Sequence, residues 1–117
     1  MDRKLAADEL ATFLATLGHP LRIRIIEELR GKELDVTSIY EALKEKQSKV
    51  SQQLSILRTQ KMIVERREGR RIFYKIVNEA LPDWLLDGLN IIQDHFEENK
   101  KIKNAIKNAK KIWQKDL

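Results

Sequence analysis

The chain has 117 residues, of which 42% are hydrophobic and 35% charged, a composition typical of one folded, soluble domain. It contains no cysteine, which excludes disulfides, thiolate metal sites and thiol-based redox sensing. No apolar run approaches the roughly 20 residues that span a bilayer. The N-terminal stretch contains acids and lacks the apolar core of a signal peptide, so we expect a cytoplasmic protein and not a membrane protein.

The net charge is +5, and its distribution along the chain is uneven. Residues 47–75 hold eight basic and two acidic residues, and residues 98–117 hold seven lysines and two acids. Residues 76–97, by contrast, hold five acids and no lysine or arginine. Two separate basic blocks favour a polyanionic partner, although a highly charged solvated surface would have the same composition.

Apolar spacing predicts four helices in the first half of the chain. A first helix over residues 3–17 ends at "GHP", where Pro20 suits the first turn of a second helix and Gly31 stops it. Asp35 is expected to cap a short third helix. A fourth helix, "QSKVSQQLSILRT", follows a brief polar turn and is expected to be capped by Gln47 or Ser48. The third and fourth helices together predict a helix-turn-helix.

The pattern then changes to that of strands. "MIVERREGRRIFYKIV" predicts a two-stranded ribbon whose tip is at Gly69, a residue that readily takes the positive φ of a tight turn. A last helix begins near residue 81, and its apolar stripe changes phase at "EENKK". Two alternatives stay open there: one very long helix, or a break near Asn99.

The predicted fold is therefore mainly α with a small β-ribbon: a winged helix-turn-helix of order ααααββα with an extended C-terminal helix. Residues 1–97 are expected to form this winged domain. Residues 98–117 are expected to form a basic, amphipathic, helical extension.

The fourth helix has the composition of a recognition helix, the helix that lies in the major groove of DNA. Val50, Leu54 and Leu57 share one face and can anchor the helix. The other faces carry serines, glutamines and lysine, which can bond base edges, and residues 47–64 contain no acid at all. Gln53 is left open between reading DNA and facing the backbone or the helix-turn-helix partner, the third helix. The predicted contacts of recognition helix 48–59 and its first turn are Gln47, Ser48, Lys49, Ser51, Gln52, Gln53, Ser55 and Arg58.

The predicted wing, residues 64–75, places four arginines around Glu68-Gly69. They can contact phosphate or enter a narrow minor groove, although charge on an edge strand also prevents sheet aggregation. The predicted DNA contacts in the wing are Arg67, Arg70 and Arg71, of which Arg70 and Arg71 are the stronger candidates. Either Phe73 or Tyr74 is expected in the core.

Three segments, "LGHPLRIRII", "VSQQLSIL" and "REGRRIFY", together resemble the ArsR/SmtB family of bacterial winged-helix repressors. The resemblance covers about residues 5–92, and Gln53 departs from it because the family often has histidine there. It implies a homodimer on a two-fold symmetric operator, pairing through the first and last helices, and release of DNA when an inducer binds. Residues 1–97 are then expected to be the winged helix-turn-helix DNA-binding and dimerisation domain. The residues expected at that interface are Leu5, Phe13, Leu85, Leu89, Ile92 and Phe96.

The metal-sensing patterns of that family are missing or incomplete. The helix that reads "DVTSIYEAL" has no cysteine, and of the last-helix pattern only His95 and Glu98 match, with Pro82 and Trp84 where ligands would stand. We therefore expect neither a metal site nor a cofactor. The chain would respond to an unidentified small molecule, to a partner protein, or to nothing beyond its own abundance.

The C-terminal segment "KKIKNAIKNAKKIWQK" exceeds what the family usually requires. Its apolar stripe, which ends at Trp113, needs a partner surface. The favoured role is packing in the dimer or on the first helix, and the alternatives are added phosphate contact or binding to an anionic membrane surface.

The predicted function is a sequence-specific transcriptional regulator, a homodimeric repressor that binds a palindromic operator in double-stranded DNA and associates with the nucleoid. The alternative is a protein-interaction module on a winged-helix scaffold, with the long C-terminal helix as its binding element. An enzyme is not expected, because the two histidines lie in unrelated contexts and no glycine-rich phosphate loop is present.

Overall fold

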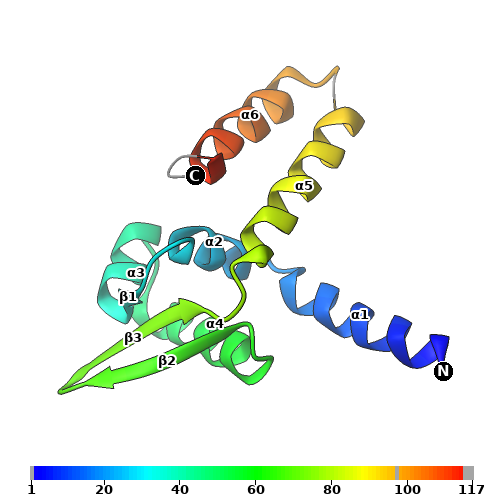
Figure 1. Ribbon diagram of the computed structural model, residues 1–117. Coiled ribbons are helices and arrows are strands. Elements are labelled where there is room, and N and C mark those ends of the chain that lie inside the picture. The colour runs from blue at the N-terminus through cyan, green and yellow to red at the C-terminus, as the bar shows by residue number, and fades with distance from the viewer. Residues whose placement is uncertain (1, 97, 115–117) are drawn as a thin grey trace. The chain divides into compact units, whose positions relative to one another are not determined.

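The computed structural model describes residues 2–96 and 98–114 (Figure 1). The chain divides into two compact units, of which the first ends at Val77 and the second begins at Asn78. In chain order the elements are α1 (Arg3–Leu17), α2 (Pro20–Leu29), β1 (Leu34–Asp35), α3 (Val36–Leu43), α4 (Gln47–Thr59), β2 (Ile63–Glu68), β3 (Arg71–Ile76), α5 (Ala80–His95) and α6 (Lys100–Gln114).

The core of the first unit lies where α2, α3 and α4 meet, and the β2–β3 ribbon extends away from it (Figure 1). Each burial of a Leu, Ile or Val side chain contributes about 1.5–3 kcal/mol to folding. The three helices therefore form a rigid platform for the elements that carry the polar residues. Its buried apolar residues are Leu21, Ile25, Ile26, Leu29, Ile39, Leu43, Val50, Leu54 and Leu57.

Side-chain caps confirm two of the predicted helix starts. The Nδ1 of His19 accepts a hydrogen bond from the backbone N–H of Leu21 (3.2 Å), with Pro20 in the first turn of α2. The carboxylate of Asp35 accepts one from the N–H of Ser38 (2.9 Å) and caps α3. The predicted cap of α4 was wrong: Lys46 occupies that position and makes no side-chain cap.

Two left-handed residues set the directions in which the chain enters and leaves α4. Lys44 (φ 55°) closes α3 and turns the chain toward α4. Lys61 (φ 61°) follows the end of α4; its N–H donates to the carbonyl of Arg58 (2.9 Å), and the N–H of Met62 donates to that of Leu57 (3.0 Å). This paired arrangement is a Schellman motif, which fixes the angle between α4 and the ribbon.

The sheet has three antiparallel strands in the order β1-β3-β2. Glu68 pairs with Arg71, so the tip is a two-residue turn of Gly69 (φ +62°) and Arg70, as the glycine predicted. Strand β1, which pairs Leu34 with Tyr74, was not predicted, because two residues are too few to show a strand period.

The second unit consists of α5 and α6, which pack against each other. The two predicted alternatives for this region are resolved in favour of a break, because α5 ends at His95 and Asn99 begins a new helix. The Oδ1 of Asn99 accepts a hydrogen bond from the N–H of Ile102 (3.2 Å), as a helix cap does. The C-terminal extension is thus a separate helix, and the division at residues 97 and 98 stays a prediction.

Candidate nucleic-acid interface

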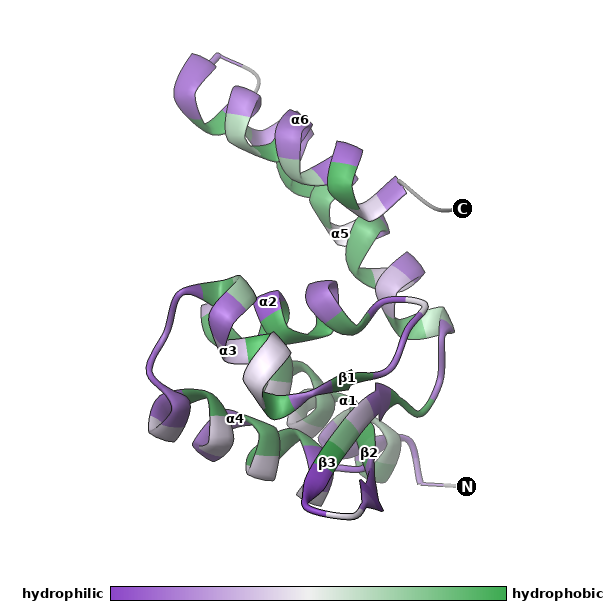
Figure 2. Cartoon of the chain, turned by 90° about the vertical axis from the view of Figure 1, so that its left-hand side faces the viewer, coloured by the Kyte–Doolittle hydropathy of each residue, from purple (hydrophilic) through white to green (hydrophobic). Residues whose placement is uncertain are grey.

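Helix α4 is anchored by one apolar face. Val50, Leu54 and Leu57 are at most 1% exposed, which confirms the predicted anchor. In Figure 2 the hydrophobic residues of α4 lie on its side toward α2 and α3, and the hydrophilic ones lie away from them. The opposite faces are thereby held rigidly in solvent.

The exposed faces of α4 carry every predicted contact except one. In the described part of the chain, the side chains of Ser48, Ser51, Gln52 and Ser55 form no hydrogen bond or ion pair, so their donors and acceptors are available to base edges. The two basic residues of α4, Lys49 and Arg58, each lie near a carboxylate. Lys49 lies 3.4 Å from Glu45, and Arg58 donates to Glu65 at 3.0 Å. Gln47 is also exposed.

Gln53 is the exception and corrects the prediction. Its side chain is 8% exposed, and its Oε1 accepts a hydrogen bond from Nε of Arg22 at 2.7 Å. The same guanidinium donates to the backbone carbonyl of Thr16 at 3.0 Å. The hydrogen bond is with α2 and not with α3, the helix-turn-helix partner that was the predicted alternative for Gln53. The residue ties α4 to α2 and to the end of α1.

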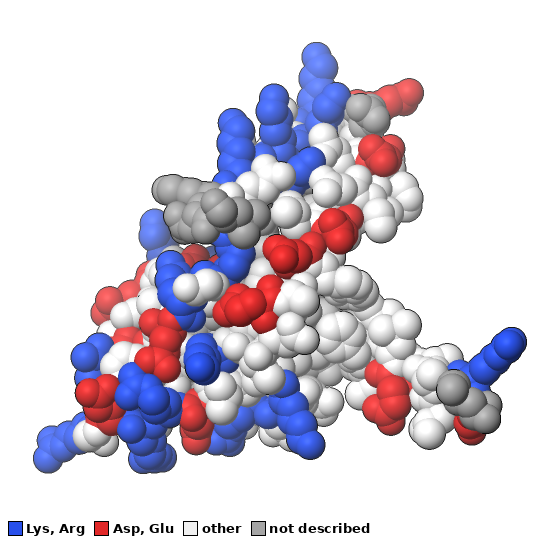
Figure 3. Space-filling model, viewed as in Figure 1, with Lys and Arg blue, Asp and Glu red and all other residues white. Residues whose placement is uncertain are grey.

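The tip of the ribbon presents two arginines to solvent. Arg67 and Arg70 are exposed, and neither has an ion pair with a carboxylate of the described residues. In Figure 3, basic side chains stand alone at the tip, whereas basic and acidic side chains interleave over the body of the ribbon. The two tip guanidiniums can therefore meet phosphate or a narrow minor groove without first breaking an internal contact.

The other two arginines of the ribbon are bound within the domain. Arg66 makes a two-pronged pair with Glu33, through its Nη2 (2.6 Å) and Nε (3.2 Å), and also donates to Glu68. Arg71 donates through Nη2 (2.7 Å) and Nε (3.2 Å) to one oxygen of Asp35. Both guanidiniums also lie over the ring of Phe73, with their central carbons 4.7 and 4.8 Å from the ring centroid.

These contacts shift the pKa values of the two carboxyl groups. The hydrogen bond from Arg66 lowers the pKa of Glu33 below its ordinary value. Hydrogen bonds from Ser38 and Arg71 lower the pKa of Asp35 to about 2. Both carboxylates are therefore ionised at neutral pH, and each neutralises part of the charge that the sequence places in the wing. Arg71 was predicted as one of the stronger candidates for a DNA contact, but two of its hydrogen-bond donors are bound to Asp35.

The two aromatic residues of the ribbon are both half-buried, so neither is the fully buried core residue that was expected. Phe73 serves the two arginines as a stacking surface. Tyr74 faces Glu65 across the strands, and burial together with that carboxylate raises the pKa of its phenol.

The residues predicted at the dimer interface differ in exposure. Leu5 is 58% exposed, Ile92 and Phe96 are also exposed, and Phe13, Leu85 and Leu89 are half-buried. On α1, Leu10 and Leu14, which share an apolar stripe with Phe13, are exposed as well. An amphipathic helix with its apolar stripe in solvent is typical of an interface.

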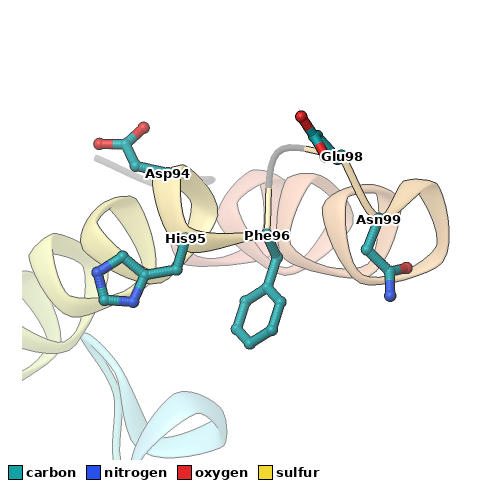
Figure 4. Close-up of a pocket in the computed structure, with 5 residues that line it drawn as sticks. All are labelled: Asp94, His95, Phe96, Glu98 and Asn99. Carbon is teal, nitrogen blue, oxygen red and sulfur yellow. The ribbon is translucent and has the colours of Figure 1, made fainter.

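The segment around His95 does not assemble a metal site in the described residues. It lines an open hollow of about 370 Å³ with Asp94, Phe96, Glu98 and Asn99. Figure 4 shows the side chains diverging, with the carboxylates of Asp94 and Glu98 directed away from the imidazole. Among the residues described, no three His, Asp or Glu side chains are grouped to hold a metal ion.

A helix-turn-helix with a polar second helix, followed by an arginine-tipped ribbon, defines a winged helix-turn-helix protein. Residues 19–63 match the family described as "Bacterial regulatory protein, arsR family". The regulator NmtR of Mycobacterium tuberculosis is 41% identical over 91 residues, which are 78% of this chain and 75% of that protein. The repressor PagR of Bacillus anthracis is 38% identical over 90 residues, 76% of this chain and 89% of PagR.

A solved structure agrees with these sequence relatives. The homodimeric winged helix-turn-helix DNA-binding domain of Mb0332 from Mycobacterium bovis superposes with a TM-score of 0.71 at 27% identity, over 86% of this chain and 94% of that domain. The chain therefore belongs to the arsR family of bacterial regulatory proteins, which confirms the predicted resemblance. None of the described helices is both long and apolar enough to cross a membrane.

Proposed function

We propose that the chain is a homodimeric transcriptional repressor that binds a palindromic operator. The observation that carries the proposal is the solvent-exposed, acid-free polar face of α4, held by a fully buried anchor. An acid-free face of serines, glutamines and a lysine suits the mixed donors and acceptors of the major groove. Membership of a family of regulatory proteins supports a regulatory rather than a catalytic role.

In this proposal α4 and the β2–β3 ribbon contact different parts of the DNA. Ser48, Ser51, Gln52 and Ser55 contact base edges, and Gln47, Lys49 and Arg58 contact phosphates at the ends of the helix. Arg67 and Arg70 contact the backbone or the minor groove beside the site. Arg71 is left with a positioning role through Asp35.

The proposed dimer rests on the exposed leucines of α1 and on the homodimeric state of the Mb0332 domain. Replacing Leu10 and Leu14 by glutamate would place charges in that interface. We expect the double variant to remain folded and to weaken self-association at least about 100-fold, since burying an unpaired charge costs several kcal/mol. Sedimentation equilibrium measures this, and an unchanged dimer would exclude α1 from the interface.

The base-reading role is tested by replacing Ser51 and Gln52 together with alanine. An operator selected from random duplexes should then bind about 10- to 1000-fold more weakly, because each good base contact is worth about 1–3 kcal/mol. Affinity for random duplex should hold, since phosphate contacts supply it. The matched control replaces Thr59 and Gln60, a hydroxyl and an amide exposed at the other end of α4. Equal losses on both duplexes would contradict base reading by α4.

The same selection with the wild-type chain tests the protein-interaction alternative. Recovery of one palindromic sequence at physiological salt supports the repressor proposal. Recovery of no preferred sequence, with a stoichiometric protein partner bound to α6, would overturn it.

A further inference from the structure

Helix α6 carries a basic face that the proposed operator contacts do not use. Its 15 residues include six lysines and no aspartate or glutamate. We define the lysine–asparagine face as five exposed residues at spacings of one, three and four along the helix: Lys100, Asn104, Lys107, Asn108 and Lys111. Figure 3 shows lysine side chains standing out in a row along α6.

The apolar side of α6 is already occupied in the folded chain. Ile106 and Trp113 are buried and Ile102 and Ala109 are half-buried, on the side opposite the lysine–asparagine face. The helix packs on α5, and its two sides differ clearly in hydropathy in Figure 2. A helix that lies in a membrane surface must place its apolar side in the lipid. The burial of Ile106 and Trp113 therefore disfavours the membrane alternative.

The charges of the lysine–asparagine face have no counter-ions within their own helix. Exposed helices usually pair lysine with glutamate three or four residues away, and like charges at that spacing are destabilising. Lys107 and Lys111 stand four residues apart, with Asn104 and Asn108 beside them. A row of phosphates relieves this repulsion, and asparagine amides donate hydrogen bonds to phosphate oxygens.

We propose that the lysine–asparagine face of α6 binds the phosphate backbone of duplex DNA outside the base pairs that α4 contacts. This inference rests on the proposed function, because DNA bound by the first unit raises the effective concentration of phosphate around the tethered second unit. The contact is independent of base sequence. It increases the affinity of the protein for DNA and the dependence of that affinity on salt. It also lengthens the DNA segment that the protein protects.

The test variant replaces Lys100, Lys107 and Lys111 together with glutamine, which retains helix propensity. The matched control removes the same charge from exposed residues elsewhere, as Arg3→Gln, Lys4→Gln and Lys32→Gln. A third protein carries arginine at the three α6 positions. Circular dichroism establishes that each variant is folded, and binding is measured from 50 to 300 mM salt on the bare operator and on the operator with flanking duplex.

We expect the glutamine variant to bind the long duplex at least about tenfold more weakly. The salt slope, which is the slope of the logarithm of the binding constant against the logarithm of the salt concentration, should decrease in magnitude by about two to five, since a dimer loses up to six phosphate contacts. The glutamine variant should lose the gain in affinity that flanking duplex gives the wild type. The control and the arginine variant should retain that gain. An equal slope for the wild type and the glutamine variant would overturn the inference.

The failures of the two proposals are distinguishable. If the wild type selects no operator, the proposed function fails, and the salt slope on random duplex still tests α6. If an operator is found and only the flanking contribution is missing, the α6 inference alone fails. Vesicles of phosphatidylglycerol serve as the remaining probe: binding that the glutamine variant loses, without any change on DNA, would assign the face to an anionic membrane.

Discussion

Helix α4 and the β2–β3 ribbon, the two elements proposed to contact DNA, relate differently to the domain that carries them. The side chains of Ser51, Gln52 and Ser55 on α4 form no hydrogen bond or ion pair with the described residues, and the helix is held by its apolar side and by Gln53. The arginines of the ribbon are divided, because Arg66 and Arg71 are bound to carboxylates and Phe73 while the two tip arginines are not.

The difference shows that a count of charges overstates the charge available to DNA. A guanidinium that already has two hydrogen bonds to a carboxylate must give them up, or share them, before it neutralises a phosphate. Exposed ion pairs contribute little to stability, so the network of Glu33, Asp35, Arg66 and Arg71 mainly orients the ribbon.

The largest expected effect tests how α4 is held. Replacing Arg22 by methionine leaves the buried Oε1 of Gln53 without its donor, which should lower the free energy of unfolding by about 1–3 kcal/mol. The double variant Arg22→Met with Gln53→Leu removes both partners and should cost less than the sum of the two single changes. Urea denaturation of the four proteins measures the coupling, and strictly additive effects would show that the contact does not hold α4.

The second prediction compares the free and the bound arginines at equal charge. Replacing Arg67 and Arg70 by glutamine should weaken operator binding about tenfold at 150 mM salt and reduce the salt slope by about two per protomer. The same change at Arg66 and Arg71 should reduce the slope by less than half as much. Fluorescence anisotropy over a salt series measures both slopes. Equal slopes would mean that the internal ion pairs open on DNA.

The third prediction concerns Asp35, which caps α3 and binds Arg71 with the same carboxylate. Asp35→Ala should cost about 1 kcal/mol of stability through the lost cap, whereas Asp35→Asn retains an acceptor and should cost less. Because the folded pKa of about 2 lies below the ordinary 3.8, the contribution of the charge is complete above pH 4.

That contribution is lost as the pH falls through 2. The stability difference between the wild type and Asp35→Asn should therefore be constant from pH 5 to 7 and should shrink between pH 4 and 2. Thermal unfolding across that range measures it, and a difference that does not change with pH would assign the effect of Asp35 to its cap alone.

The smallest effect concerns the turn that joins the two elements. Lys61 has the left-handed backbone that glycine adopts without a steric cost, so Lys61→Gly should stabilise the domain by up to about 1 kcal/mol. A matched Lys32→Gly change should not stabilise it. Loss of stability in Lys61→Gly would show that the lysine side chain itself holds the angle between α4 and the ribbon.

Local patterns were sufficient to predict the four helices of the first unit, the ribbon and the apolar anchor of α4. These features depend on the spacing of apolar residues, on helix caps and on turn residues, all of which can be recognised within a short stretch of sequence. The partners of Gln53 and Arg71 could not be predicted, because Arg22 and Asp35 are 31 and 36 residues away in the chain. The phase change at "EENKK" left a break open, and the structure shows that Asn99 caps the helix that begins after the break.

The separation within α4 between an anchor and a solvent-exposed polar face has a consequence for how such a protein diverges. Ser48, Ser51, Gln52 and Ser55 can be exchanged with little effect on folding, because surface substitutions of this kind usually change stability by less than about 0.5 kcal/mol. A duplicated copy could therefore acquire a new operator through a few single steps, each of them a folded protein. Gln53, in the middle of the same segment, is not free to vary in this way.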